Sequence, residues 1–180
     1  MRFYIWILIV LSLTSSAQVK FGGGFEFLSS GNGHGSFLSP HLSVDKGKNS
    51  FISGLMMKGG TIRGVKVTWS RNLSNEDRDP IQLNAMSYLQ YIRPTEISKS
   101  LAISESMIWS GNGVNYNLVK VSTVEFGCGI ELRIDIDDWV FIRNFVGFGF
   151  YYHPQYVKMD HERIATTLQL GTGISFVIDK

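Results

Sequence analysis

Three polar residues alternate along one short segment, and together they could carry out acyl transfer. In the stretch FLSPHLSVD, His41, Ser43 and Asp45 are two residues apart, so in an extended strand their side chains share one face. A serine hydroxyl becomes a nucleophile when a histidine within hydrogen-bond reach takes its proton and an acidic group orients that histidine. No partner glutamate can be assigned from the sequence. We keep this set as an alternative, and we predict that the chain has no catalytic residue.

Paired glycines and four histidines raise two further possibilities, a nucleotide site and a metal site. The G-x-G pairs recur along the chain, but none extends to G-x-G-x-x-G or opens a predicted helix, as a phosphate site requires. One loop carries four residues of metal-ligand type: His153, Asp160, His161 and Glu162. No H-x-H or H-x-x-x-H spacing accompanies them. We therefore predict no cofactor, no cofactor-binding residue and no metal-binding residue.

The elements that would position these residues are strands, because apolar and polar residues alternate with a period of two. In VEFGCGIELRID (124–135), six apolar residues alternate with six that are charged or glycine. NFVGFGFYYH (144–153) and ATTLQLGTGISFVI (165–178) show the same pattern. The glycines fall on the polar face, where we expect them to make room for large interior side chains.

Nine runs can be read as strands: 19–27, 37–45, 50–58, 64–72, 82–92, 99–109, 124–135, 144–153 and 165–178. A closed bacterial barrel has an even number of strands. We therefore merge 50–58 with 61–72 into one strand kinked at Gly59-Gly60, which gives eight. A missed run would give ten, and 82–92 also fits helical spacing. The sequence predicts an all-β fold, a closed antiparallel up-and-down β-barrel of about eight strands.

The polar faces of these runs carry charges of both signs: Glu26, Asp45, Lys66, Glu125, Glu131, Arg133 and Arg143. A lining of one sign would indicate a selective pore. Mixed charges in a narrow barrel instead pair with each other, because an unpaired buried charge is costly. We expect interior salt bridges that plug the barrel.

The first residues, MRFYIWILIVLSLTSSAQ, have the form of a secretory signal peptide. Arg2 precedes an apolar run that is shorter than the roughly 20 residues of a transmembrane helix. We predict a signal peptide at 1–17, cleaved after Ala17, and a single barrel domain at 18–180. The lone Cys128 leaves no acylation site after the apolar run and no internal disulfide. The formal charge of +2 argues against a nucleic-acid partner.

These features together resemble the small outer-membrane β-barrel (porin-like) proteins of Gram-negative bacteria, most closely in VEFGCGIEL, NFVGFGFYY and LGTGISFVI. The resemblance implies a transmembrane barrel in contact with outer-membrane lipid, without enzymatic activity and with a structural, adhesive or weak transport role. The short turn near 135–138 and the long segment 153–164 would then place the chain's end in the periplasm.

Two alternatives stay open. A soluble, exported lipocalin-like barrel would turn its apolar face inward around a small apolar ligand. An outer-membrane lipid acyl-hydrolase would use a core to which HLS is similar, although Val44 stands where such enzymes usually have asparagine.

Overall fold

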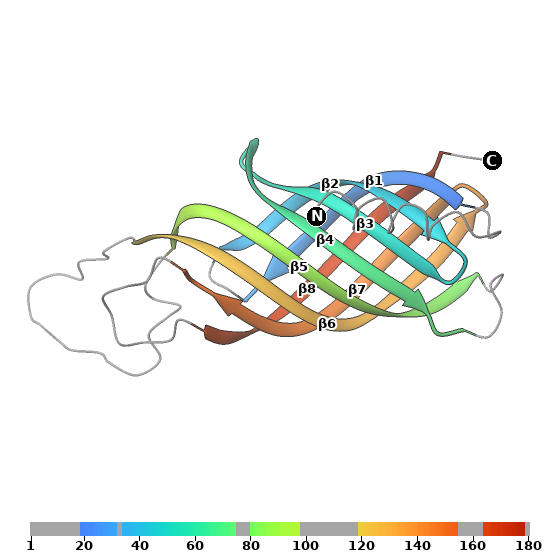
Figure 1. Ribbon diagram of the computed structural model, residues 1–180. Coiled ribbons are helices and arrows are strands. Elements are labelled where there is room, and N and C mark those ends of the chain that lie inside the picture. Colours follow the sequence, from blue (N-terminus) through green and yellow to red (C-terminus); the bar gives the residue numbers. More distant parts are fainter. Residues whose placement is uncertain (1–18, 32–33, 75–79, 98–118, 155–163, 179–180) are drawn as a thin grey trace, which may run out of the picture.

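The computed structural model describes residues 19–31, 34–74, 80–97, 119–154 and 164–178, and eight strands hold most of them (Figure 1). In chain order the strands are β1 (Val19–Ser30), β2 (Gly35–Lys46), β3 (Asn49–Lys58), β4 (Thr61–Asn72), β5 (Ile81–Ile97), β6 (Val119–Asp137), β7 (Val140–Tyr152) and β8 (Ile164–Val177). No described residue belongs to a helix that is long and apolar enough to cross a membrane.

Each strand pairs antiparallel with the next one in the chain, and β1 pairs with β8, which closes the sheet into a barrel. The predicted all-β, closed, up-and-down barrel of eight strands is therefore confirmed. In the pairing of β6 with β7, glycine lies opposite glycine and apolar residue opposite apolar residue, as at Gly127↔Gly149 and Phe126↔Phe150. The period-two pattern of each strand thus continues around the barrel.

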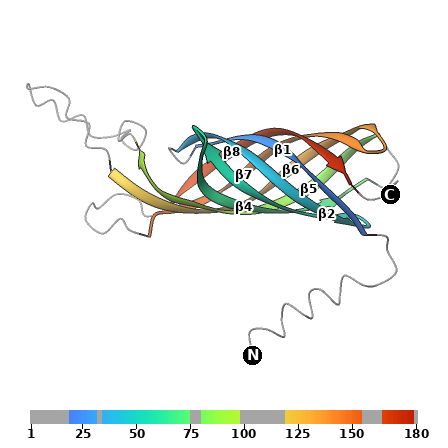
Figure 2. The same cartoon turned by 90° about the horizontal axis from the view of Figure 1, so that it is seen from above.

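The connections divide between two ends of the barrel (Figure 2). At one, the terminal end, β1 starts, β8 finishes, and the short turns at 47–48 and 138–139 connect their strands. At the other, the loop end, β5 and β7 finish and β6 and β8 start. The long connecting sequences 98–118 and 153–163 therefore join their strands at the loop end, which also carries the two-residue connection at 59–60 between β3 and β4.

The strand count of eight is right, but the merging of 50–58 with 61–72 is wrong. Gly59 and Gly60 form a two-residue hairpin turn between β3 and β4, with φ of 58° and 75°. Two consecutive positive φ values are what the tightest hairpin turns need, and glycine adopts them without strain. The helical alternative for 82–92 is also wrong, since these residues lie in β5. The ninth run, 99–109, lies outside the described residues.

The two faces of the sheet differ in polarity in the direction opposite to that of most soluble proteins. Large apolar side chains on the outside are about half exposed, for example Phe126 at 52%, Ile130 at 51% and Phe148 at 56%. Their neighbours in the chain point inward and are polar, for example Glu125 at 0% and Glu131 at 2%. The barrel thus has an apolar exterior and a largely polar interior.

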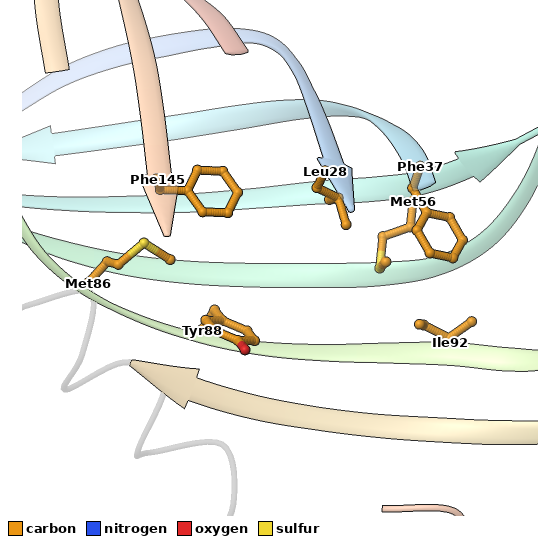
Figure 3. Close-up of a cluster of buried hydrophobic side chains, with 7 residues drawn as sticks. All are labelled: Leu28, Phe37, Met56, Met86, Tyr88, Ile92 and Phe145. Atoms are coloured by element: carbon orange, nitrogen blue, oxygen red, sulfur yellow. The ribbon is translucent and has the colours of Figure 1, made fainter. Parts of the chain in front are cut away.

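A small apolar cluster lies within this polar interior (Figure 3). Its members are Leu28, Phe37, Met56, Met86, Tyr88, Ile92 and Phe145. Met56 belongs to β3 and three other members belong to β5. In these two strands large apolar residues occur on the inner face as well as on the outer face, which explains why their alternation in the sequence is the least clear.

Glycines on the inner face make room for the largest members of this cluster, as the sequence predicts. A Cβ atom at Gly127 would lie 2.7 Å from the Tyr88 hydroxyl oxygen, and one at Gly147 would lie 2.8 Å from the Tyr88 ring. A Cβ atom at Gly171 would collide with the ring of Phe145. One glycine of each pair in β6, β7 and β8 therefore allows an aromatic ring to fill a narrow lumen, whereas a Cβ atom at the other, Gly129, Gly149 or Gly173, would meet the backbone of a neighbouring strand.

Candidate functional site

The most concentrated chemistry in the molecule is a group of charged residues at the centre of the lumen. This central network consists of Glu26, Lys66, Asn84, Glu131 and Arg143, which come from β1, β4, β5, β6 and β7. The Lys66 ammonium donates to Glu26 over 2.5 Å, and Arg143 lies 3.6 Å from the same carboxylate. Arg143 also pairs with Glu131, which accepts a 2.8 Å hydrogen bond from the Asn84 amide. The two contacts to Glu26, from Lys66 and from Arg143, join strands that are not neighbours in the sheet, so the network crosses the lumen.

The central network is electrically balanced. Two carboxylates face two cations, and the side chains of all four are at most 4% exposed. The Lys66 ammonium also lies 4.2 Å from the centre of the Phe145 ring, a cation–π contact. Charges taken out of water are stable only when paired and hydrogen-bonded. The expected interior salt bridges are therefore present, and they occupy the middle of the barrel.

A second polar group fills the lumen between the centre and the loop end, around Glu125. Its carboxylate accepts hydrogen bonds from Ser30 at 2.8 Å, Tyr88 at 3.0 Å and Gln90 at 2.7 Å. Gln90 in turn accepts a 2.9 Å hydrogen bond from Gln169 on the opposite side of the barrel. Several hydrogen-bond donors thus converge on a carboxylate that is fully buried.

Two histidines lie at the loop end, where they connect the β1–β2 turn to β6 and to the end of β7. His34 Nε2 is 2.5 Å from the Thr123 hydroxyl, which is 2.9 Å from His153 Nδ1. Burial lowers the pKa of His34 to about 4, and the nearby His153 and Lys58 add to this effect. Burial also lowers the pKa of His153, against the opposing effect of its hydrogen bond to the Ser122 carbonyl. Both rings are therefore neutral at pH 7.

The terminal end instead opens into a polar hollow of about 840 Å³. Arg133 projects into it, donates to Asp135 over 2.7 Å and lies 3.5 Å from Asp45. The guanidinium also lies 3.7 Å from the centre of the Phe141 ring. Asn84 of the central network lines the same hollow, so the network lies at its inner boundary.

The candidate catalytic set does not assemble. The ring of His41 shares a 2.9 Å hydrogen bond with Ser175 of β8, and Asp45 contacts Arg133. Ser43 is buried on the same inner face, but no hydrogen bond among the described residues joins it to His41. Period two places the three side chains on one face, as predicted, yet each is directed to a different position in the lumen.

The remaining candidate sites from the sequence can be located only in part. Within the described ranges, no group of three or more His, Cys, Asp or Glu residues could hold a metal ion. Asp160, His161 and Glu162 lie outside those ranges, as does the predicted signal peptide at 1–17. The glycine pairs of β6, β7 and β8 lie in the middle of strands and not at the start of a helix, where a nucleotide site would need them. Gly127 and Gly147 face Tyr88.

Several residues of the interior networks were missed by sequence reasoning, among them Asn84, Tyr88, Gln90 and Gln169. The signal was present in β5, where Gln82, Asn84, Met86, Tyr88 and Gln90 alternate on the buried face. Because Met86 and Tyr88 interrupt the polar character of that face, the strand did not show a clear polar side.

No protein-family model matches the chain, and no curated protein matches its sequence. The class of molecule is therefore defined by the fold and the interior alone. It is a closed eight-stranded antiparallel barrel whose outside is apolar and whose inside is polar and internally paired. This architecture is compatible with the small outer-membrane barrels that the sequence resembles.

Proposed function

We propose that the chain is a non-enzymatic integral outer-membrane β-barrel protein with a structural or adhesive role. The observation that carries this proposal is the apolar outer face, which includes Phe25, Ile130 and Phe148, each more than half exposed. A soluble monomer rarely exposes a contiguous apolar patch larger than a few hundred Å². Hydrocarbon lipid tails are the environment in which such an exterior is stable.

Strand length supports the same proposal. A tilted strand needs about 9–11 residues to cross the hydrocarbon layer. The shortest strand, β3, has 10 residues, and β1, β2 and β4 have 12 each. Every strand is therefore long enough to span a bilayer.

The connections at the two ends of the barrel support a particular orientation of the barrel in the membrane. Outer-membrane barrels have short turns on the periplasmic side and longer loops outside the cell. The two longest connections, 98–118 and 153–163, lie at the loop end, so we assign the terminal end, with its turns at 47–48 and 138–139, to the periplasm. Trp139 stacks on Phe176 at this end, and Tyr91 and Tyr152 are exposed toward the other. Exposed aromatic rings near both ends suit the two membrane–water interfaces.

The filled lumen favours a structural or adhesive role over transport. Eight strands enclose a space just wide enough for side chains. Here the central network and the Glu125 group cross that space at successive depths. A solute would have to break buried ion pairs to pass, so we propose that the barrel does not conduct.

Cysteine labelling after cell fractionation tests the proposal. The variant carries Cys128→Ser and Ile130→Cys, and the matched control carries Cys128→Ser and Ser43→Cys, whose side chain is 4% exposed on the inner face. We expect the protein in the outer-membrane fraction, with position 130 reactive toward a membrane-soluble thiol reagent and resistant to a water-soluble one. Position 43 should resist the membrane-soluble reagent.

Recovery of the protein from the soluble periplasm after gentle lysis would refute the proposal. Reaction of position 130 with the water-soluble reagent would do the same. If an added apolar ligand protected position 130, the lipocalin-like alternative would replace it.

A further inference from the structure

The hollow at the terminal end is a blind cup rather than part of a channel. It is lined by residues of β1–β6 and β8, by the turn at 47–48 and by Asp138, and Asn84 joins it to the central network. Its volume of about 840 Å³ lies within the range of small-molecule sites in proteins, roughly 300–1,000 Å³. The cup opens where β1 starts and β8 finishes, so a small molecule from that side can enter it.

Three side-chain oxygen atoms of this lining are buried and have no hydrogen-bond partner within the described chain. They are Ser70 Oγ, Asn84 Oδ1 and Asp45 Oδ1. Ser70 is 1% exposed and Asn84 is 5% exposed, so both side chains are deeply buried and line the cup. Buried polar atoms in native proteins are nearly always hydrogen-bonded to protein, to ordered water or to a ligand, so these three oxygens are available to water or to a ligand that enters the cup.

The chemistry of these atoms specifies what the ligand must supply. A carboxylate oxygen and an amide oxygen can only accept hydrogen bonds, and a serine hydroxyl can accept as well as donate. The nearby Arg133 is shared between Asp45 and Asp135. The whole lining carries four carboxylates, from Asp45, Asp135, Asp137 and Asp138, and three cations, Lys20, Lys48 and Arg133, so it has one excess negative charge. The cup therefore favours a positively charged ligand that has several hydrogen-bond donors.

We propose that the cup binds a small cationic amine, whose ammonium group donates hydrogen bonds to the unpaired oxygens of Asp45, Ser70 and Asn84. A primary ammonium carries one positive charge and three N–H donors, which matches one excess carboxylate and three acceptors. This inference goes beyond the proposed function and does not depend on the membrane location of the barrel.

Titration calorimetry on the full chain purified in detergent tests the proposal, with putrescine as the probe. The matched neutral probe is 1,4-butanediol, which has the same chain length with hydroxyl groups in place of the ammonium groups. The key variant is Ser70→Ala, because the Ser70 hydroxyl makes no hydrogen bond in the described chain and its loss should not destabilise the barrel. The control variant is Ser53→Ala, an outward-facing serine of β3.

We expect saturable binding of putrescine and no binding of 1,4-butanediol. Ser70→Ala should weaken putrescine binding about tenfold, the effect of losing one hydrogen bond to a charged group. Ser53→Ala should leave binding unchanged, and the unfolding midpoints of both variants should match that of the unaltered chain. Equal binding of the two probes, or no binding of putrescine, would overturn the proposal. Undiminished binding to Ser70→Ala would also overturn it, because the amine would then bind only to carboxylates at the rim.

Discussion

Replacing Arg143 tests whether the central network stabilises the barrel through charge balance. Arg143 contacts both carboxylates of the network and its side chain is 3% exposed. In Arg143→Met, Glu26 would keep Lys66 as its partner, but Glu131 would keep only the Asn84 amide. Removing one member of a buried ion pair typically costs about 3–5 kcal/mol. Because Glu131 retains one donor, we expect a loss near the lower limit, about 3 kcal/mol.

The double variant Glu131→Gln/Arg143→Met separates charge balance from packing. The glutamine keeps an oxygen that can accept from Asn84, and the network would again contain one carboxylate and one cation. We expect the double variant to recover at least half of the stability lost in Arg143→Met. The two substitutions would therefore be strongly non-additive, as is usual for residues in direct contact.

Denaturant unfolding followed by tryptophan fluorescence measures both effects in the same detergent or lipid. With a slope of about 1–3 kcal/mol per molar urea, a loss of 3 kcal/mol moves the midpoint by roughly 1–3 M. Arg71→Met is the control, because Arg71 is exposed near the end of β4 and should change stability by less than about 0.5 kcal/mol. A loss below 1 kcal/mol in Arg143→Met, or a double variant less stable than the single one, would refute the reasoning.

Three further results are expected. Asn144→Leu should stabilise the barrel in lipid by roughly 1–3 kcal/mol, because Asn144 places a polar amide on the outer face of β7, where lipid offers it no hydrogen bond. Destabilisation of this variant in unfolding measurements would count against membrane insertion. Gly127→Ala should destabilise the barrel by about 1–3 kcal/mol through clashes with the Phe148 carbonyl oxygen and with Tyr88, and Tyr88→Leu in the same chain should relieve the Tyr88 part of that loss. Folding lowers the pKa of His34 from 6.5 to about 4, so the unfolded chain binds a proton at a higher pH than the folded chain does. The free energy of unfolding should therefore drop by up to roughly 3 kcal/mol as the pH falls from 6.5 to 4. His34→Gln should flatten this part of the profile of stability against pH, and an unchanged profile would contradict the assignment.

The fold could be predicted from the sequence because alternation in the last three strands leaves few choices. In β6, apolar residues such as Phe126 and Ile130 alternate with Glu125 and Glu131, and a one-residue slip would exchange the faces. The pattern therefore fixes which side chains share a face. It does not fix where a strand ends, so the glycines at 59–60 were read as a kink, whereas their positive φ values form a turn.

The interior contacts could not be predicted from the same pattern. Lys66 and Glu26 are 40 residues apart, and Gln90 and Gln169 are 79 apart. Which inward side chains meet depends on strand tilt and on the stagger of neighbouring strands, since these set the relative heights of residues across the lumen. The candidate triad of β2 failed for this reason: His41 meets Ser175 across β1, whereas Ser43 lies elsewhere in the lumen.

The contacts that were hardest to predict are also the ones that constrain the barrel most. Hydrogen bonds within the sheet join neighbouring strands only, and they would form equally well in a slipped register. The bonds from Lys66 to Glu26 and from Gln169 to Gln90 join strands that are not neighbours, so each requires a particular stagger. A slip that moved Glu131 outward would place a carboxylate on the apolar face and leave Arg143 to share Glu26 with Lys66. The polar interior thus selects one register among those that the backbone permits, and the apolar exterior penalises the others.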